Sequence, residues 1–104
     1  MAYKLIFYLL FFISNISATT IIDVRTSSEW NSGHLDGAIN IEWQNILSLS
    51  KDISKDEKIY LYCRSGNRSG KATKILLDNG YQNVINAGSL EQASKLLNKN
   101  IINQ

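Results

Sequence analysis

Residues 59–70 read IYLYCRSGNRSG, and this stretch carries the strongest indication of the fold. Its first four residues are apolar or aromatic, which is typical of a buried strand. The following eight are small, polar or basic and contain two glycines, as expected for a loop. Ala72, Ile75 and Leu76 then recur at helical spacing. The stretch therefore predicts a strand, a loop and a helix in that order.

Three shorter apolar segments, residues 21–24, 38–41 and 83–86, also have strand character, and helical patterns separate them. Strands that alternate with helices predict a small three-layer α/β domain, with a parallel central sheet flanked by helices. Strand 59–62 would be its central strand. Ligands of such sheets bind beyond the carboxyl ends of the strands, and Cys63 directly follows one of these ends.

Two helices begin with a recognisable cap. Thr26 precedes Glu29 by three residues, and Ser89 precedes Gln92 by three, which is the spacing of a capping box. The apolar faces expected for the second and the last helix are formed by Trp43, Ile46 and Leu47 and by Ala93, Leu96 and Leu97. The polar residues 48–58 predict a surface connection before the central strand.

The N-terminal 18 residues differ in composition from the rest. Lys4 precedes an unbroken apolar run over residues 5–13, and Ser17-Ala18 offers a cleavage site. The run is too short for a bilayer, which needs about 20 apolar residues. We therefore expect a signal peptide over residues 1–18, a single domain over residues 19–104 and an exported protein. An uncleaved N-terminal anchor and a buried core helix are the alternatives.

Charge and cysteine content exclude several classes of site. Removal of Lys4 with the signal peptide leaves 10 basic and 9 acidic residues, so no polybasic surface for nucleic acid is expected, nor a membrane contact after cleavage. The single cysteine cannot form an internal disulfide. With one histidine and no Cys-x-x-Cys motif, a cysteine and histidine zinc site within one chain is excluded. A lone cysteine in an exported protein indicates a reactive or intermolecularly paired thiol.

The loop after the central strand favours a reactive thiol. An ordinary thiol has a pKa near ~8.5, so little thiolate exists at neutral pH. Arg64 and Arg68 place two positive charges near Cys63, and a helix that begins near Ser69 would direct its N-terminus toward the loop. Gly66 allows the backbone to curl so that its amides face an anion. The alternative is an inert buried thiol, which two neighbouring arginines make a poor interpretation.

Two motifs resemble those of the rhodanese family of sulfurtransferases. The first is the loop Cys63-Arg64-Ser65-Gly66-Asn67-Arg68-Ser69 between a strand and a helix. The second comprises Asp23-Val24-Arg25, Glu29-Trp30 and the segment GHLDGAINI at residues 33–41. The resemblance covers about residues 21–97, and the small exported single-domain rhodaneses of the phage-shock type are closest in length and layout.

The resemblance implies a persulfide mechanism. The Cys63 thiolate would attack the outer sulfur of thiosulfate or a similar sulfur-containing anion, and a thiophilic acceptor such as cyanide would then remove the sulfur. The loop amides would hold the persulfide and the donor oxygens, with added charge from Arg64 and Arg68. The resemblance implies no metal and no organic cofactor. It also implies a bacterial periplasmic location and leaves room for an unidentified sulfur-acceptor protein.

The upstream motif is interpreted as structural support. Asp23 and Arg25 lie at a predicted strand-to-helix turn and are expected to form a hydrogen-bonded scaffold. His34 lies in a glycine-flanked turn, which favours a structural hydrogen bond over catalysis. Trp30 and Trp43 are expected to be core aromatics.

Three other functions compete with this interpretation. Cysteine-dependent phosphatases and arsenate reductases also hold a thiolate in an arginine-bearing loop, but tyrosine-phosphatase loops have five residues between cysteine and arginine. Here four residues separate Cys63 from Arg68. A partner-specific sulfur or redox carrier would use the same cysteine. A non-catalytic binding module would usually have lost it. The chain also has Gly88-Ser89-Leu90 where the family often has two glycines and then a tryptophan, so donor preference stays open.

Overall fold

The structure is a computed structural model that describes residues 18–103. The predicted signal peptide lies almost entirely outside the described residues. The elements in chain order are β1 (Thr19–Asp23), α2 (Ser27–Asn31), β2 (His34–Leu35), β3 (Ile39–Asn40), the 3-10 helix η2 (Trp43–Asn45), α3 (Ile46–Leu49), β4 (Lys58–Cys63), α4 (Asn67–Asp78), β5 (Asn83–Ser89), α5 (Leu90–Leu97) and β6 (Ile101–Ile102). Within residues 18–103, no helix is long and apolar enough to cross a membrane.

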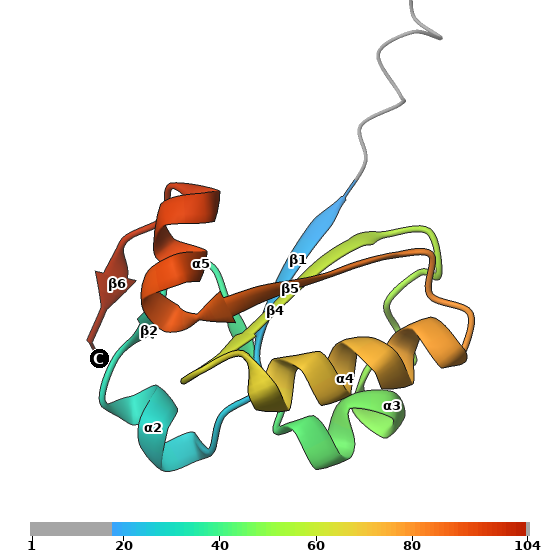
Figure 1. Ribbon diagram of the computed structural model, residues 1–104, viewed down its shortest axis with the longest axis horizontal. Coiled ribbons are helices and arrows are strands. Elements are labelled where there is room, and N and C mark those ends of the chain that lie inside the picture. The colour runs from blue at the N-terminus through green and yellow to red at the C-terminus, as the bar shows by residue number, and fades with distance from the viewer. Residues whose placement is uncertain (1–17, 104) are drawn as a thin grey trace, which may run out of the picture.

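The predicted α/β architecture with a parallel central sheet is confirmed. Four strands form a parallel sheet in the order β3-β1-β4-β5, so β4 is an interior strand. Helices α3 and α4 lie on one face, and α5 lies on the other together with the short antiparallel pair β2 and β6 (Figure 1). Both faces of β4 are therefore covered, which is why this strand is apolar without alternation.

Each face of the sheet has its own apolar cluster. Leu61 and Cys63 point to the face of α4 and are fully buried there, together with Leu76 of that helix. Tyr62, between them in sequence, points to the opposite face and is fully buried beside Ala93 of α5. Because successive side chains of a strand alternate in direction, Cys63 ends the strand on the side where α4 begins.

Both predicted helix caps are confirmed. The Thr26 hydroxyl accepts a hydrogen bond from the Glu29 amide at 3.2 Å, and the Glu29 carboxylate accepts one from the Thr26 amide at 3.1 Å. The same reciprocal pair joins Ser89 and Gln92. Helix α4 begins at Asn67, two residues before the expected position, because Gly66 is its N-cap residue.

Two predictions of buried helix faces are wrong in part. Leu47 of α3 is 39% exposed and Leu96 of α5 is 58% exposed, although both lie at helical spacing from buried neighbours. Helix α3 is only four residues long and therefore presents little more than Ile46 to the core.

The expectation that residues 83–86 form the last strand of the chain is wrong. A further short strand, β6, follows α5 and pairs with β2. The pairing of a two-residue strand depends on tertiary contacts and leaves no sequence pattern.

Candidate active site

Cys63 is the last residue of β4, and the loop that follows folds back over its sulfur. The Sγ atom accepts hydrogen bonds from the amide of Gly66 at 3.0 Å and from the amide of Ser69 at 3.4 Å. The Ser69 hydroxyl oxygen lies 3.3 Å from the same sulfur. The thiol is therefore fully buried at the base of a loop whose backbone donors converge on it.

Gly66 makes this curl of the backbone possible. Its φ of 91° lies in the left-handed region, which a residue with a side chain rarely adopts. A Cβ atom at this position would also lie 3.4 Å from the Cα atom of Gly88. The same residue is the N-cap of α4, so the first amides of the helix lie next to the sulfur.

The surroundings of Cys63 lower the pKa of its thiol. Burial is the largest single influence and raises the pKa, because it disfavours the charged thiolate. The hydrogen bonds outweigh it, first from the Ser69 hydroxyl and then from the amides of Ser69, Ser65 and Gly66. We expected three influences to lower this pKa: the charges of Arg64 and Arg68, the N-terminus of the following helix, and backbone amides turned inward at Gly66. The amides are among the causes, whereas the Ser69 hydroxyl, the first of the groups that lower the pKa, was not expected. The loop thus favours the nucleophilic form of the thiol.

Asn86 of β5 holds the loop in place, and its role was not predicted from the sequence. Its Oδ1 accepts hydrogen bonds from the Ser69 hydroxyl at 2.7 Å and from the Gly88 amide at 3.0 Å. Its Nδ2 donates to the carbonyl of Gly66 at 3.0 Å. Asn86 pairs in register with Leu61, two residues before Cys63. The sequence offered one signal for this role, a polar residue within a predicted strand. Only the strand order, which places β5 next to β4, shows that Asn86 lies beside the Cys63 loop.

The two arginines of the loop have different surroundings. Arg68 forms a bidentate ion pair with Glu29, with Nη1 to Oε1 at 2.7 Å and Nη2 to Oε2 at 2.9 Å. Its charge is therefore balanced by α2. Arg64 is exposed and forms no ion pair within residues 18–103. Of the two charges predicted to act on an anion, the structure leaves only that of Arg64 without a partner in the described part of the chain.

Asp23 and Arg25 form a hydrogen-bonded pair, as the sequence had suggested. The Arg25 guanidinium donates from Nη2 to Asp23 Oδ2 and to the Gly33 carbonyl, each at 2.7 Å. Both side chains are buried. His34 is also buried, and its Nδ1 lies 3.1 Å from the Trp30 carbonyl. These contacts connect β1, α2 and the turn before β2.

Trp30 is not a core aromatic in the expected sense. Its ring stacks on the His34 ring with 3.5 Å between centroids, and the side chain is half-buried. Trp43 packs against the cluster under α4, as expected, and is also half-buried. Neither tryptophan lines the cavity beside the Cys63 loop that is described next.

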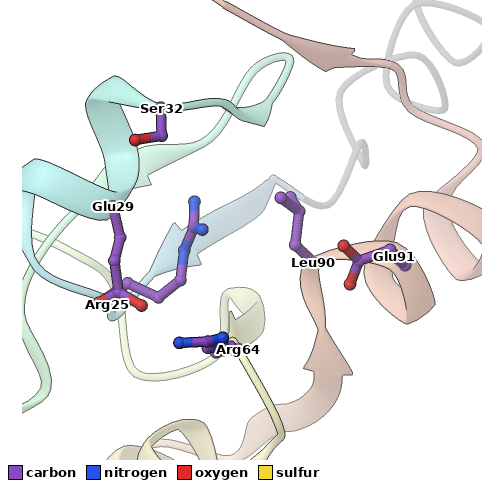
Figure 2. A pocket seen from close by; sticks show the side chains of 6 residues that line it. All are labelled: Arg25, Glu29, Ser32, Arg64, Leu90 and Glu91. Atoms are coloured by element: carbon purple, nitrogen blue, oxygen red, sulfur yellow. The ribbon is translucent and has the colours of Figure 1, made fainter.

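A cavity of about 260 Å³ opens beside the loop. Figure 2 shows the side chains that line it, which are Arg25, Glu29, Ser32, Arg64, Leu90 and Glu91. They come from the turn after β1, from α2, from the loop after β4 and from the start of α5. Since Arg64 directly follows Cys63, a molecule in this cavity lies next to the loop that holds the sulfur. Ser65 and Asn67 lie on the exposed outer side of that loop.

Comparison with known proteins agrees with this geometry. Residues 12–95 match the family described as the rhodanese-like domain, and the match begins inside the predicted signal peptide. YqhL of Bacillus subtilis is 38% identical over 66 residues, which are 64% of this chain and 52% of YqhL. The thiosulfate sulfurtransferase PspE of Escherichia coli is 36% identical over 72 residues, covering 67% of this chain and 69% of PspE.

A solved structure of a rhodanese with anions from E. coli has a TM-score of 0.74 and 30% identity, and the match covers 84% of this chain and 100% of that one. The chain spans about half the length of YqhL and between 16% and 22% of the larger adenylyltransferase and sulfurtransferase UBA4 relatives that it matches. The matched region contains the complete β4, the Cys63 loop and α4. The chain therefore belongs to the rhodanese-like domain family.

Proposed function

We propose that the protein is a thiosulfate sulfurtransferase that carries the transferred sulfur as a persulfide on Cys63. The observation that carries the proposal is the set of donors around one buried sulfur, with the amides of Gly66 and Ser69 at 3.0 and 3.4 Å from Sγ. They stabilise a thiolate before the reaction. They could equally stabilise a persulfide afterwards, because its outer sulfur is also anionic.

The transfer has two balanced steps. In the first, the Cys63 thiolate attacks the outer sulfur of thiosulfate, a new S–S bond forms, and the bond to the inner sulfur breaks with its electron pair on the leaving sulfite. In the second, an acceptor such as cyanide attacks the outer sulfur of the persulfide. The electron pair of that S–S bond returns to Cys63 Sγ as thiolate, so no external oxidant or reductant is required.

The dimensions of the site favour a small sulfur anion. The Cys63 thiol has no exposed surface, so a donor must enter the loop to reach it. The adjoining cavity of about 260 Å³ lies just below the range of roughly 300–1,000 Å³ that is usual for drug-sized ligands. Arg64 lines this cavity and supplies the positive charge for the donor oxygens.

Two observations speak against a phosphatase. Four residues separate Cys63 from Arg68, which makes a tighter loop than that of a tyrosine phosphatase. The Arg68 guanidinium is also engaged by both oxygens of Glu29, so it does not extend into the loop where a phosphate would need it. A partner-specific sulfur carrier would use the same thiol. It would differ from the enzyme only in the second step, because it would release the sulfur to a particular protein and not to a small acceptor such as cyanide.

The test is the intact mass of the protein after incubation with thiosulfate, with and without cyanide. We expect a gain of one sulfur atom, its loss on addition of cyanide, and no gain in the variant Cys63→Ser, whose circular dichroism should match the wild type. A persulfide that forms but resists cyanide would indicate a carrier. A sulfur gain in Cys63→Ser would refute the mechanism.

For export, we propose that the signal peptide is cleaved after Ala18. The mass of the protein recovered outside the cytoplasm would report whether the mature chain begins at Thr19.

A further inference from the structure

The cavity beside the Cys63 loop is bordered by two acidic and two basic side chains. Two of these side chains, Arg25 and Glu29, already form ion pairs with other residues of the protein. Arg25 is bound to the carboxylate of Asp23 and to the Gly33 carbonyl. Glu29 is held by both guanidinium nitrogens of Arg68. Neither charge is therefore free to bind a ligand without breaking a short ion pair.

Arg64 and Glu91 are the other pair. Both are exposed, and neither forms an ion pair within residues 18–103. Figure 2 shows that they reach the cavity from different elements, Arg64 from the loop after Cys63 and Glu91 from the first turn of α5. The Leu90 side chain also lines the cavity and gives it an apolar surface beside Glu91. The cavity thus offers one positive group, one negative group and an apolar surface.

We propose that the sulfur acceptor of this protein is a zwitterionic thiol of amino-acid size, with its carboxylate on Arg64 and its ammonium group on Glu91. The inference rests on the proposed persulfide at Cys63. Thiosulfate itself has no positive group, so Glu91 offers the donor no attractive contact, whereas it attracts the ammonium group of an acceptor. A cavity of about 260 Å³ is large enough for a single amino acid.

The chemical step is a thiolate exchange. The acceptor thiolate attacks the outer sulfur of the Cys63 persulfide, and a new S–S bond forms between them. The S–S bond to Cys63 breaks, and its electron pair stays on Sγ as thiolate. The product is the persulfide of the acceptor, and the proton of the acceptor thiol has passed to water before the attack.

Acceptor specificity tests this proposal. Protein loaded with sulfur would be freed of donor and mixed with L-cysteine or with N-acetylcysteine, which keeps the carboxylate but lacks the ammonium group. The rate of sulfur loss from Cys63 would be followed by intact mass and divided by the thiolate fraction of each acceptor and by the intrinsic reactivity of its thiolate, which rises with the pKa of the thiol. We expect a preference of about fivefold for cysteine, the upper end for an exposed ion pair. In Glu91→Gln this ratio should fall to about one, because the carboxylate that binds the ammonium group is gone.

Asp52→Asn is the matched control, since Asp52 also carries a carboxylate and is exposed but does not line the cavity. It should keep the fivefold ratio. Equal rates for the two acceptors in the wild type, or a preference that survives in Glu91→Gln, would overturn the inference. Loading is measured separately, and polysulfide serves as a second donor. If polysulfide loads Cys63 and thiosulfate does not, the proposed donor is wrong while the acceptor test proceeds unchanged; if neither loads it, both proposals fail.

Discussion

The sulfur of Cys63 and the oxygen of Asn86 compete for one proton. The Ser69 hydroxyl donates its hydrogen to Asn86 Oδ1 at 2.7 Å, and its oxygen lies 3.3 Å from Cys63 Sγ. In this arrangement a protonated thiol donates to the Ser69 oxygen. Once the thiol has lost its proton, the hydroxyl gains more by turning toward the charged sulfur, because hydrogen bonds to charged groups are stronger. Ser69 can therefore serve both protonation states.

Ser69→Ala should make Cys63 less reactive at neutral pH. The pKa of the folded thiol is lowered, and the Ser69 hydroxyl is the first of the groups that lower it. Without that hydroxyl the pKa rises, a smaller fraction of the thiol is ionised at neutral pH, and alkylation slows by about threefold to tenfold, the equivalent of one hydrogen bond. The midpoint of the alkylation rate against pH should move to higher pH.

Ser65→Ala is the control for this measurement. Ser65 belongs to the same loop, but its hydroxyl forms no hydrogen bond with Cys63 among the described residues. Its alkylation profile should coincide with that of the wild type. A Ser69→Ala profile that also coincided would show that the backbone amides alone determine the acidity of the thiol.

At the scale of elements, the short helix α2 depends on contacts outside itself. Five residues are too few for a helix that is stable on its own. The capping box joins Glu29 to Thr26 at its start, and the same carboxylate binds Arg68 in the first turn of α4. Glu29 thus connects the helix that borders the cavity to the helix that carries the Cys63 loop.

Glu29→Gln isolates the contribution of this ion pair, because glutamine at the same position still completes a capping box. We expect the free energy of unfolding to fall by about 1 kcal/mol at neutral pH, as measured by urea denaturation. Hydrogen bonds to its carboxylate, first from Arg68 and then from Thr26, lower the pKa of Glu29 from 4.5 to about 2 in the folded protein, against the opposing influence of burial. A lowered pKa stabilises the folded state above the unfolded value, so the difference between wild type and variant should shrink as the pH falls from about 4.5 to about 2.

The Lys74–Asp78 pair on α4 provides the comparison. Its N···O distance of 2.8 Å is similar, but it has a single contact instead of two, and its side chains are 76% and 61% exposed. Asp78→Asn should therefore leave the free energy of unfolding nearly unchanged. A cost for Glu29→Gln that stayed constant down to low pH would mean that the loss arises from packing and not from charge.

For the molecule as a whole, local patterns predicted the elements better than their contacts. The strand before Cys63, the two capping boxes and the α4 face of Ala72 and Leu76 all follow from signals within a few residues, and the structure confirms them. The roles of Asn86 and Glu29 in the site depend instead on which strands and helices become neighbours. Such neighbours lie 17 to 39 residues away in sequence, as in Ser69–Asn86 and Arg68–Glu29, where no periodicity operates.

The same limit explains the errors of burial. Leu96 lies on the predicted apolar face of α5, yet it is 58% exposed. Helical spacing identifies which residues share a face, but not how far the neighbouring elements extend over that face. In α4 the helical spacing gave the right result: Leu76 lies on the predicted face and is buried, and Leu77, which lies off that face, is 47% exposed.

Leu76 and Leu77 are neighbouring leucines in α4 that differ in burial, so the same substitution at both positions measures the effect of burial. Leu76 is fully buried in the cluster between α4 and the sheet. Leu76→Ala should lower the free energy of unfolding by about 3 kcal/mol, because it removes buried methyl groups and leaves a cavity. Leu77→Ala should lower it by less than about 1 kcal/mol. Urea denaturation of both variants measures the difference.

The expected loss for Leu76→Ala is large for so small a domain, whose total stability is on the order of 5–10 kcal/mol. It also bears on the site, because α4 presents the Ser69 amide and hydroxyl to Cys63 from its first turn. Near-equal losses in the two variants would mean that α4 is not held against the sheet by this face. The donors at its start would then have to be held by Asn86 and the ion pair with Glu29 alone.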